Sequence, residues 1–380
     1  MAAILTVNPD TEFIRDVLGS GARDLKKCYQ CATCTSVCDL ATETMPFPRK
    51  QMIEAQWGLK DKLMGDPAIW LCHNCDHCTA HCPRDAKPGQ VMGALRAQAI
   101  RNFAFPRFMG KVTADPKFLP LLLALPILIF AAMALWAPKG LPTPALEFTN
   151  VFPDSVLEGL FFAVSGVVML VYAVGVVRMV QALRREGFQG RLLPHLAPTV
   201  MEIVGHKRFS KCGTENNRYW GHLLTFSGFG GLFGVEIIMG IGYWTNTILP
   251  PLPLLHPLKL LVNFFTLLIS TGLIVMLAER MGGRSRKAPN SYFDWFFLLT
   301  LVGVVITGIL SEILRLEQAR MQMYSAYFVH LVLVFSLFLY APYSKFAHLV
   351  YRTVAIAVTR EQREQKGRAT AGQAALGSSQ

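Results

Sequence analysis

Residues 28–38 read CYQCATCTSVC, and residues 72–82 read CHNCDHCTAHC with Pro83 directly after them. Both stretches have the spacing C-x2-C-x2-C-x3-C, in which three thiolates surround one iron–sulfur cluster and the fourth ligates a second cluster. We therefore expect two [4Fe–4S] clusters, one held by Cys28, Cys31, Cys34 and Cys82, and the other by Cys72, Cys75, Cys78 and Cys38.

The cysteine runs have two other interpretations. Zinc also accepts four thiolates, but it usually needs only two C-x2-C pairs. A disulfide framework is not expected, because the N-terminus shows no basic and apolar signal sequence. The histidines between the cysteines, His73, His77 and His81, could be ligands, although each cluster already has four thiolates. We expect them to be neighbours of the clusters.

The chain around the cysteines is expected to be helical. Residues 49–57 and 89–104 have helical patterns and do not resemble short β-hairpins. We therefore predict an all-α, ferredoxin-type domain with two [4Fe–4S] clusters over residues 1–112.

The rest of the chain is strongly apolar. Hydrophobic residues make up 52% of the 380 residues and charged residues only 16%, too apolar for an ordinary soluble protein. Six stretches can each cross a bilayer as a helix: 118–137, 156–179, 220–244, 255–278, 292–313 and 324–346. We predict a six-helix transmembrane cytochrome b bundle over 113–360 and a flexible tail over 361–380.

The distribution of basic residues predicts the orientation in the membrane. The net charge of +12 is concentrated beside the apolar stretches, a pattern that indicates membrane topology and argues against a nucleic-acid partner. If the cysteine domain is cytoplasmic, the inner loops hold 17 Lys and Arg and the outer loops hold 3. We therefore expect a multi-pass protein of the cell inner membrane with both termini and the iron–sulfur domain in the cytoplasm.

Four histidines lie within or at the ends of the predicted spans: His222, His256, His330 and His348. His330 and His348 are 18 residues apart, which is five helical turns and about 27 Å on one face of a single helix. We expect two b-type haems, an inner one on His222 and His348 and an outer one on His256 and His330. No C-x-x-C-H motif is present, which excludes a covalent c-type haem.

Four further residues have open roles. His206 could replace a haem ligand or contact a quinone. Glu236 and Lys259 lie inside spans and could serve a proton path, a haem propionate or each other. Cys212 is expected to be an unliganded thiol.

These motifs resemble a known group of redox proteins. Residues 1–112 resemble the iron–sulfur C subunit of heterodisulfide reductase. Residues 118–360 resemble two membrane subunits, the cytochrome b subunit of that enzyme and, more distantly, the gamma subunit of nitrate reductase. The cysteine runs, residues 205–212 and 218–222, and the His330/His348 pair carry the resemblance. Their fusion in one chain is similar to the C subunit of the quinone-interacting membrane-bound oxidoreductase complex.

The resemblance implies an electron-transfer subunit that links menaquinol to partner subunits. These partners would contain flavin and iron–sulfur centres and would be similar to the A subunit of heterodisulfide reductase. Through them, electrons would be exchanged with adenylylsulfate reductase in sulfate respiration. Leu232 stands where the gamma subunit has its second histidine, and the catalytic disulfide-reducing motif is absent. The alternatives are an equivalent subunit of a sulfite-reduction or heterodisulfide-type complex, or a non-redox, metal-bearing membrane anchor.

Overall fold

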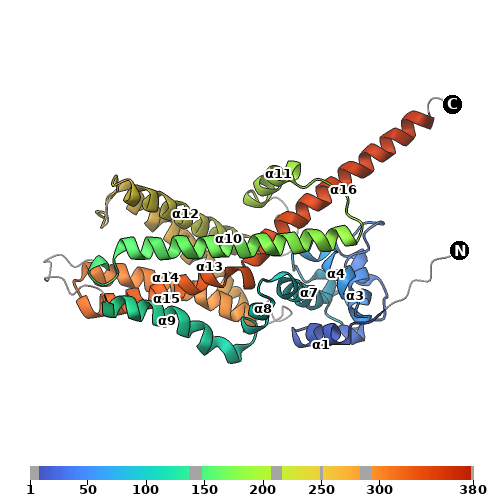
Figure 1. The fold of residues 1–380 in the computed structure, drawn as a ribbon. Coiled ribbons are helices and arrows are strands. Elements are labelled where there is room, and N and C mark those ends of the chain that lie inside the picture. The colour runs from blue at the N-terminus through green and yellow to red at the C-terminus, as the bar shows by residue number, and fades with distance from the viewer. Residues whose placement is uncertain (1–7, 137–147, 207–215, 249–250, 283–291, 378–380) are drawn as a thin grey trace.

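The computed structural model describes residues 8–136, 148–206, 216–248, 251–282 and 292–377. Every regular element within these ranges is a helix, and one isolated β-bridge joins Thr42 to Met45. Figure 1 shows short helices gathered at one end of the molecule and long helices extending from them. This arrangement confirms the predicted all-α fold.

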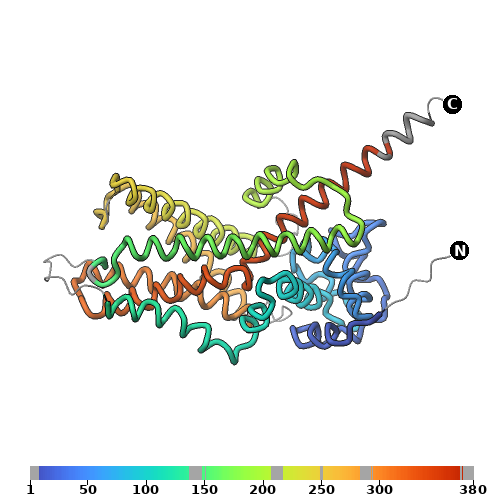
Figure 2. The backbone as a smooth tube through the Cα atoms, in the orientation of Figure 1, coloured from blue at the N-terminus to red at the C-terminus, as the bar shows by residue number. Residues whose placement is uncertain are grey.

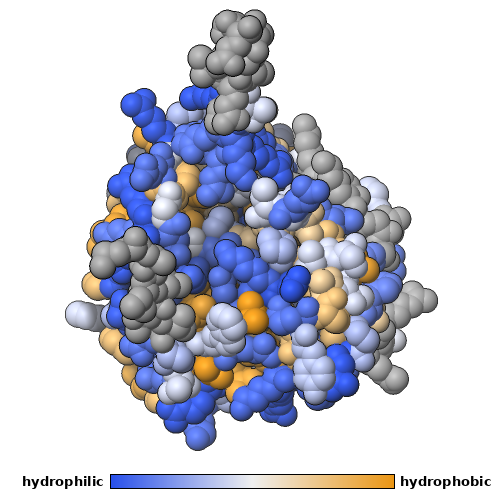
Figure 3. All heavy atoms as spheres, turned by 90° about the vertical axis from the view of Figure 1, so that its right-hand side faces the viewer, coloured by the Kyte–Doolittle hydropathy of each residue, from blue (hydrophilic) through white to orange (hydrophobic). Residues whose placement is uncertain are grey.

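The N-terminal unit consists of short helices around a buried core. The longest, α7 (Pro88–Phe103), begins with a proline, which fits the first helical position. Its side chains Leu95 and Phe103 share the core with Trp70. The other helices are α1 (Thr11–Gly19), α2 (Thr33–Ser36), α3 (Arg49–Gln56), α4 (Lys60–Met64), α5 (Ala68–Leu71), α6 (His77–Ala80) and α8 (Arg107–Val112). Seen from this end, the molecular surface is largely hydrophilic (Figure 3).

Six helices of the described residues are long and apolar enough to cross a membrane. They are α9 (Leu119–Trp136), α10 (Asp154–Arg185), α12 (Asn216–Trp244), α13 (Pro257–Met281), α14 (Tyr292–Leu316) and α15 (Arg320–Leu339). Large apolar side chains such as Phe162, Leu128 and Leu267 are exposed on them, as expected of surfaces that face lipid. The six predicted stretches therefore correspond to six helices, although the ends differ.

The largest difference is at the end of the sixth span. Helix α15 ends at Leu339 and is followed by a 3-10 turn over Ala341–Tyr343, and α16 (Ala347–Gly377) then begins. Pro342 lies in this turn, and proline cannot donate the hydrogen bond that a continuing helix requires. His330 lies in the middle of α15 and His348 near the start of α16. The prediction that both leave one face of a single helix is wrong.

The predicted flexible tail is also helical as far as Gly377. Figure 2 shows α16 leaving the bundle and passing the N-terminal unit. Two tail side chains contact other parts of the chain, because Gln365 donates to the Gln189 carbonyl and Lys366 Nζ lies 3.4 Å from Thr44 Oγ1.

Helix α10 joins the two parts of the molecule. Its 32 residues span about 48 Å, more than the hydrocarbon core requires. Met179 and Leu183 near its C-terminal end are buried in the same core as Trp70, and so is Tyr351 of α16. The N-terminal unit and the membrane helices therefore share one hydrophobic core.

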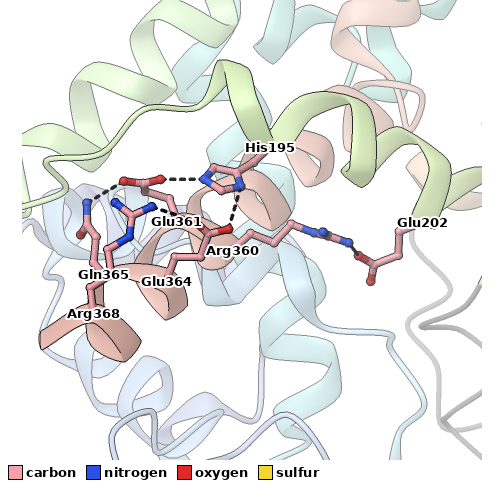
Figure 4. Close-up of polar contacts among 7 residues, drawn as sticks. All are labelled: His195, Glu202, Arg360, Glu361, Glu364, Gln365 and Arg368. Carbon is pink, nitrogen blue, oxygen red and sulfur yellow. Dashed lines mark hydrogen bonds and ion pairs between the residues drawn. The ribbon is translucent and has the colours of Figure 1, made fainter. Parts of the chain in front are cut away.

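A helix that the sequence did not reveal, α11 (Leu193–Val204), packs against α16. His195 Nε2 lies 2.6 Å from Glu361 Oε2, and its Nδ1 lies 3.7 Å from Glu364 Oε1 (Figure 4). Arg360 and Glu202 form a second ion pair between the two helices. These contacts fix the end of α11, from which the chain leads directly to His206.

Candidate cofactor sites

The first cysteine cavity combines residues from both cysteine runs. It is lined by Cys28, Cys31 and Cys34 of the first run and by Cys82, the last cysteine of the second. Cys34 is buried and Cys31 is exposed. Gln30 Nε2 donates to Cys28 Sγ over 3.5 Å. The four cysteines predicted to hold one cluster thus surround a single cavity.

The second cavity has the reciprocal composition. It is lined by Cys72, Cys75 and Cys78 of the second run and by Cys38, the last cysteine of the first. The backbone N–H of Asn74 donates to Cys72 Sγ over 3.4 Å, and hydrogen bonds to the ligand sulfurs are one way in which proteins tune a cluster. The structure therefore brings together the second predicted set as well.

The two runs repeat the same backbone conformation 44 residues apart. Gln30 and Ala32 have φ of 60° and 68°, and the equivalent Asn74 and Asp76 have φ of 55° and 61°. Left-handed conformations are uncommon for residues other than glycine and cluster at functional sites. In each run the third cysteine then lies in a short helix, α2 or α6. This repeat turns three cysteines of each run toward one cavity.

The donor chemistry fits iron–sulfur clusters. None of the eight cysteines in the two runs forms a disulfide. Burial raises the pKa of Cys34 to about 11, and burial also raises the pKa of Cys38 and of Cys78. The pKa of the exposed Cys31 is lowered because its thiolate accepts a hydrogen bond from Thr33. Sets of four soft sulfur donors suit iron–sulfur clusters or zinc.

The three histidines of the second run lie beside the cysteines. His73 and His77 line the second cavity. His73 Nδ1 accepts a hydrogen bond from Arg352 Nη2 over 3.0 Å, and His81 Nδ1 lies 2.9 Å from the carbonyl oxygen of His77. For His73 and His81, one ring nitrogen thus has a partner outside the four-cysteine set.

Three histidines gather where α12, α16 and the end of α11 meet. His222 lies in the second turn of α12, and His348 is close enough for electrostatic interaction with it. His206, which is buried, places its Nε2 3.1 Å from His222 Nδ1. His206 and His222 are thus in contact, and His348, the other predicted inner ligand, lies within electrostatic range of His222.

The hydrogen bonds define which nitrogen of each ring carries a lone pair. His206 Nδ1 lies 3.1 Å from the Val204 carbonyl and must donate to it, so its Nε2 accepts from His222 Nδ1–H. His348 Nδ1 similarly donates to the Lys345 carbonyl. In His222 and in His348 it is then Nε2 that carries the lone pair with which histidine binds iron. A metal-bound histidine commonly donates its second N–H in this way.

The predicted outer pair has a different geometry. His330 Nδ1 donates to the Val304 carbonyl over 3.0 Å, so the lone pair of His330 is on Nε2. His256 caps α13, and its Nδ1 accepts from the Leu258 backbone N–H over 3.3 Å. The proton of neutral His256 is then on Nε2, and that form cannot bind iron through Nε2. No hydrogen bond or ring contact among the described residues joins His256 to His330.

The remaining predicted residues have different outcomes. Lys259 Nζ pairs with Glu312 Oε1 at 3.0 Å, so its partner is not Glu236. Glu236 lies on α12, in the membrane part of the chain. Cys212 falls outside the described residues.

Arginines that the sequence analysis missed connect the histidine site to the second cysteine run. Arg352 Nη1 lies 3.5 Å from the Cys72 carbonyl oxygen, and Arg218 Nη1 lies 3.0 Å from that of Asn74. Each arginine is four residues from a candidate ligand, His348 or His222, so each pair occupies one face of its helix. This spacing was visible in the sequence, but the contacts with the cysteine run were not.

Comparison with known proteins identifies the N-terminal region. Residues 24–86 match the 4Fe-4S dicluster domain. Over 95 residues the chain is 38% identical to the C subunit of H(2):CoB-CoM heterodisulfide,ferredoxin reductase of Methanothermobacter thermautotrophicus, covering 25% of this chain and 51% of that protein. Over 110 residues it is 34% identical to an iron-sulfur C subunit of the CoB--CoM heterodisulfide reductase of Methanocaldococcus jannaschii, covering 27% and 59%. The N-terminal region is therefore a 4Fe-4S domain similar to these heterodisulfide reductase subunits.

A third match extends into the membrane part. The chain is 24% identical over 329 residues to citrate utilization protein B of Escherichia coli, covering 78% of this chain and 83% of that protein. No solved structure matches the chain. The chain spans about half the length of the heterodisulfide reductase subunits that it matches.

Proposed function

We propose that this protein transfers electrons between the membrane quinone pool and a cytoplasmic redox partner, through two b haems and two [4Fe–4S] clusters. The observation that carries the proposal is the connection of the two candidate sites by Arg218 and Arg352, which reach from the helices of His222 and His348 to the second cysteine run.

Each cysteine cavity has the donors for one cubane. Cys28, Cys31, Cys34 and Cys82 would hold one cluster, and Cys72, Cys75, Cys78 and Cys38 the other. The clusters would supply one-electron transfer without bond making in the protein. The protein residues contribute the sulfur ligands, the hydrogen bonds to those sulfurs and the spacing between the two cavities.

His222 and His348 would hold the inner haem, because both present Nε2 and their second nitrogens have partners. His330 would provide one ligand of the outer haem. His256 could join it only by releasing the cap of α13. The inner pair is therefore the better supported part of the haem proposal.

The orientation follows from charge. The loops on the side of the cysteine domain hold most of the basic residues, and such loops remain in the cytoplasm. The protein would then lie in the cell inner membrane, with both termini and the clusters on the cytoplasmic side. Within the membrane, menaquinol would donate electrons or menaquinone would accept them.

The resemblance to heterodisulfide reductase subunits supports partners that contain flavin and iron–sulfur centres, similar to the A subunit of that enzyme. Adenylylsulfate reductase would be reached through those partners in sulfate respiration. A second candidate function has the same electron route but a redox partner from organic-acid metabolism. The match to citrate utilization protein B, which extends over both parts of the chain, favours this second function.

Cofactor analysis of the protein purified in mild detergent tests the proposal. We expect about eight non-haem irons per chain, acid-labile sulfide, and a reduced b-type absorption band of two haems. Zinc without iron, or the absence of a b-type band, would contradict the electron route. The proteins that co-purify would distinguish the two candidate partners.

A further inference from the structure

Two helices present a histidine and an arginine in the same way. On α12, Arg218 precedes His222 by four residues, and on α16, Arg352 follows His348 by four residues. Residues four apart lie on the same side of a helix. Each helix therefore carries a candidate haem ligand and, one turn away, an arginine that reaches the cysteine domain.

Both arginines contact the short segment 72–74 of the second cysteine run. Arg352 approaches the Cys72 carbonyl and donates to His73, while Arg218 donates to the Asn74 carbonyl. A third arginine, Arg96 of α7, donates to the Cys72 carbonyl over 3.1 Å and lies 3.3 Å from Asn74 Oδ1. Three guanidinium groups from three helices thus meet at the backbone beside Cys72. We call Arg96, Arg218 and Arg352 the arginine cluster.

The first cysteine cavity lacks an equivalent arrangement among the described residues. Arg49 and Arg84 line it, but both are exposed. Arg84 lies over the exposed ring of Tyr29, and Arg49 Nε lies 3.4 Å from Gln30 Oε1. Water and salt screen exposed charges more strongly than partly buried ones. Asp39 and Asp76 line the second cavity and no described arginine does, so the half-buried arginine cluster supplies the positive charge on that side.

We propose that the arginine cluster raises the reduction potential of the cluster held by Cys72, Cys75, Cys78 and Cys38, and fixes that cluster against the helices of His222 and His348. Reduction adds one electron and no bond changes, so nearby positive charge stabilises the reduced, more negative state. The arginines are positioning residues, since they act through the segment 72–74. This inference rests on the proposed function, because it requires the clusters to be bound.

Redox titration of the complete detergent-purified protein, followed by electron paramagnetic resonance, tests the inference. Cys31→Ser and Cys75→Ser assign the signals to the first and second clusters. Arg352→Gln should lower the midpoint reduction potential of the second cluster and leave that of the first cluster unchanged. Arg352→Lys, which keeps the charge, should retain most of the wild-type midpoint.

Arg178→Gln is the matched control. Arg178 also donates to backbone carbonyls, those of Phe103 and Ala104, but it lies on α10 and none of its described hydrogen bonds goes to the cysteine runs. It should leave both midpoints unchanged. If Arg352→Gln does not fold, Arg218→Gln removes a charge from the same segment and is expected to give the same downward shift.

In protein that binds both clusters, either of two results would overturn the inference. One is that the arginine variants keep the wild-type midpoint reduction potentials. The other is that the potentials of both clusters shift equally. Wild-type protein without iron would instead contradict the proposed function, so the two failures are distinguishable.

Discussion

The rings of Trp70 and Tyr351 are in contact, with centroids 5.1 Å apart and ring planes inclined by 40°. Trp70 lies two residues before Cys72, and Tyr351 lies three residues after His348. Both side chains are buried. The helix that carries a candidate haem ligand is therefore packed directly against the start of the second cysteine run.

Tyr351→Ala should weaken this junction. Removing a buried aromatic ring leaves a cavity and costs about 3 kcal/mol of stability. Thermal unfolding in detergent, followed by circular dichroism, should show a lower midpoint temperature for Tyr351→Ala than for the wild-type protein. Phe108→Ala is the control, because Phe108 is 62% exposed and should change the midpoint temperature little. Equal midpoints for Tyr351→Ala and wild type would contradict the shared core.

The crossed cysteine sets predict an unusual pattern of iron loss. Cys38→Ser and Cys75→Ser should each remove the same cluster, leaving about four non-haem irons per chain. The double variant should lose no more iron than either single variant. Combining Cys38→Ser with Cys31→Ser should instead remove both clusters. Iron analysis checks this, and loss of all iron in the Cys38/Cys75 double variant would contradict the assignment.

His206 is expected to orient His222 without binding iron itself. His206→Ala removes the acceptor of His222 Nδ1–H, and loss of such a partner typically weakens metal binding ten- to a hundred-fold. His206→Gln retains an acceptor and should recover haem retention, measured by the b-type absorption after purification. Complete loss of one haem in both variants would identify His206 as a ligand.

His256→Ala should retain all bound haem, because the imidazole of His256 is used as a cap. We expect only a stability loss of about 0.5–1 kcal/mol from the missing cap. His330→Ala is the comparison and should lose one haem. Haem content per chain decides between them, and a haem lost in His256→Ala would restore the predicted outer pair.

Burial raises the pKa of Glu54 in α3. A carboxyl whose folded-state pKa is raised destabilises the fold as pH rises above its unfolded value of about 4.3. Glu54→Gln should therefore increase stability at pH 7, and the gain should disappear near pH 4. Denaturant unfolding at the two pH values measures this. A gain of the same size from Glu43→Gln, at an exposed position, would contradict the burial argument.

The sequence could predict which cysteines meet, since the spacing of each run leaves its fourth cysteine for the other cavity. It could not predict the end of the sixth span. Ala341, Tyr343 and Phe346 extend the apolar character beyond Leu339, but the chain turns at Pro342. The mistaken pairing of His330 and His348 on one helix followed from this.

The sequence also could not reveal contacts between distant segments. Arg352 contacts Cys72 across 280 positions, and His195 contacts Glu361 across 166. The sequence around Arg352 and around His195 contains no local pattern that identifies such a distant partner. The four-residue spacing of Arg218 and His222, and of His348 and Arg352, becomes informative only when the fold brings the two helices to one segment.

Stopped-flow reduction of the purified protein by a menaquinol analogue tests the central claim most directly. Wild-type protein should show reduction of the b-type band and then bleaching of the iron–sulfur absorption. In His348→Ala, which retains all eight cysteines of the two runs, the bleaching should slow at least ten-fold. Bleaching at the wild-type rate in His348→Ala would show that electrons reach the clusters without the inner haem, and would contradict the account.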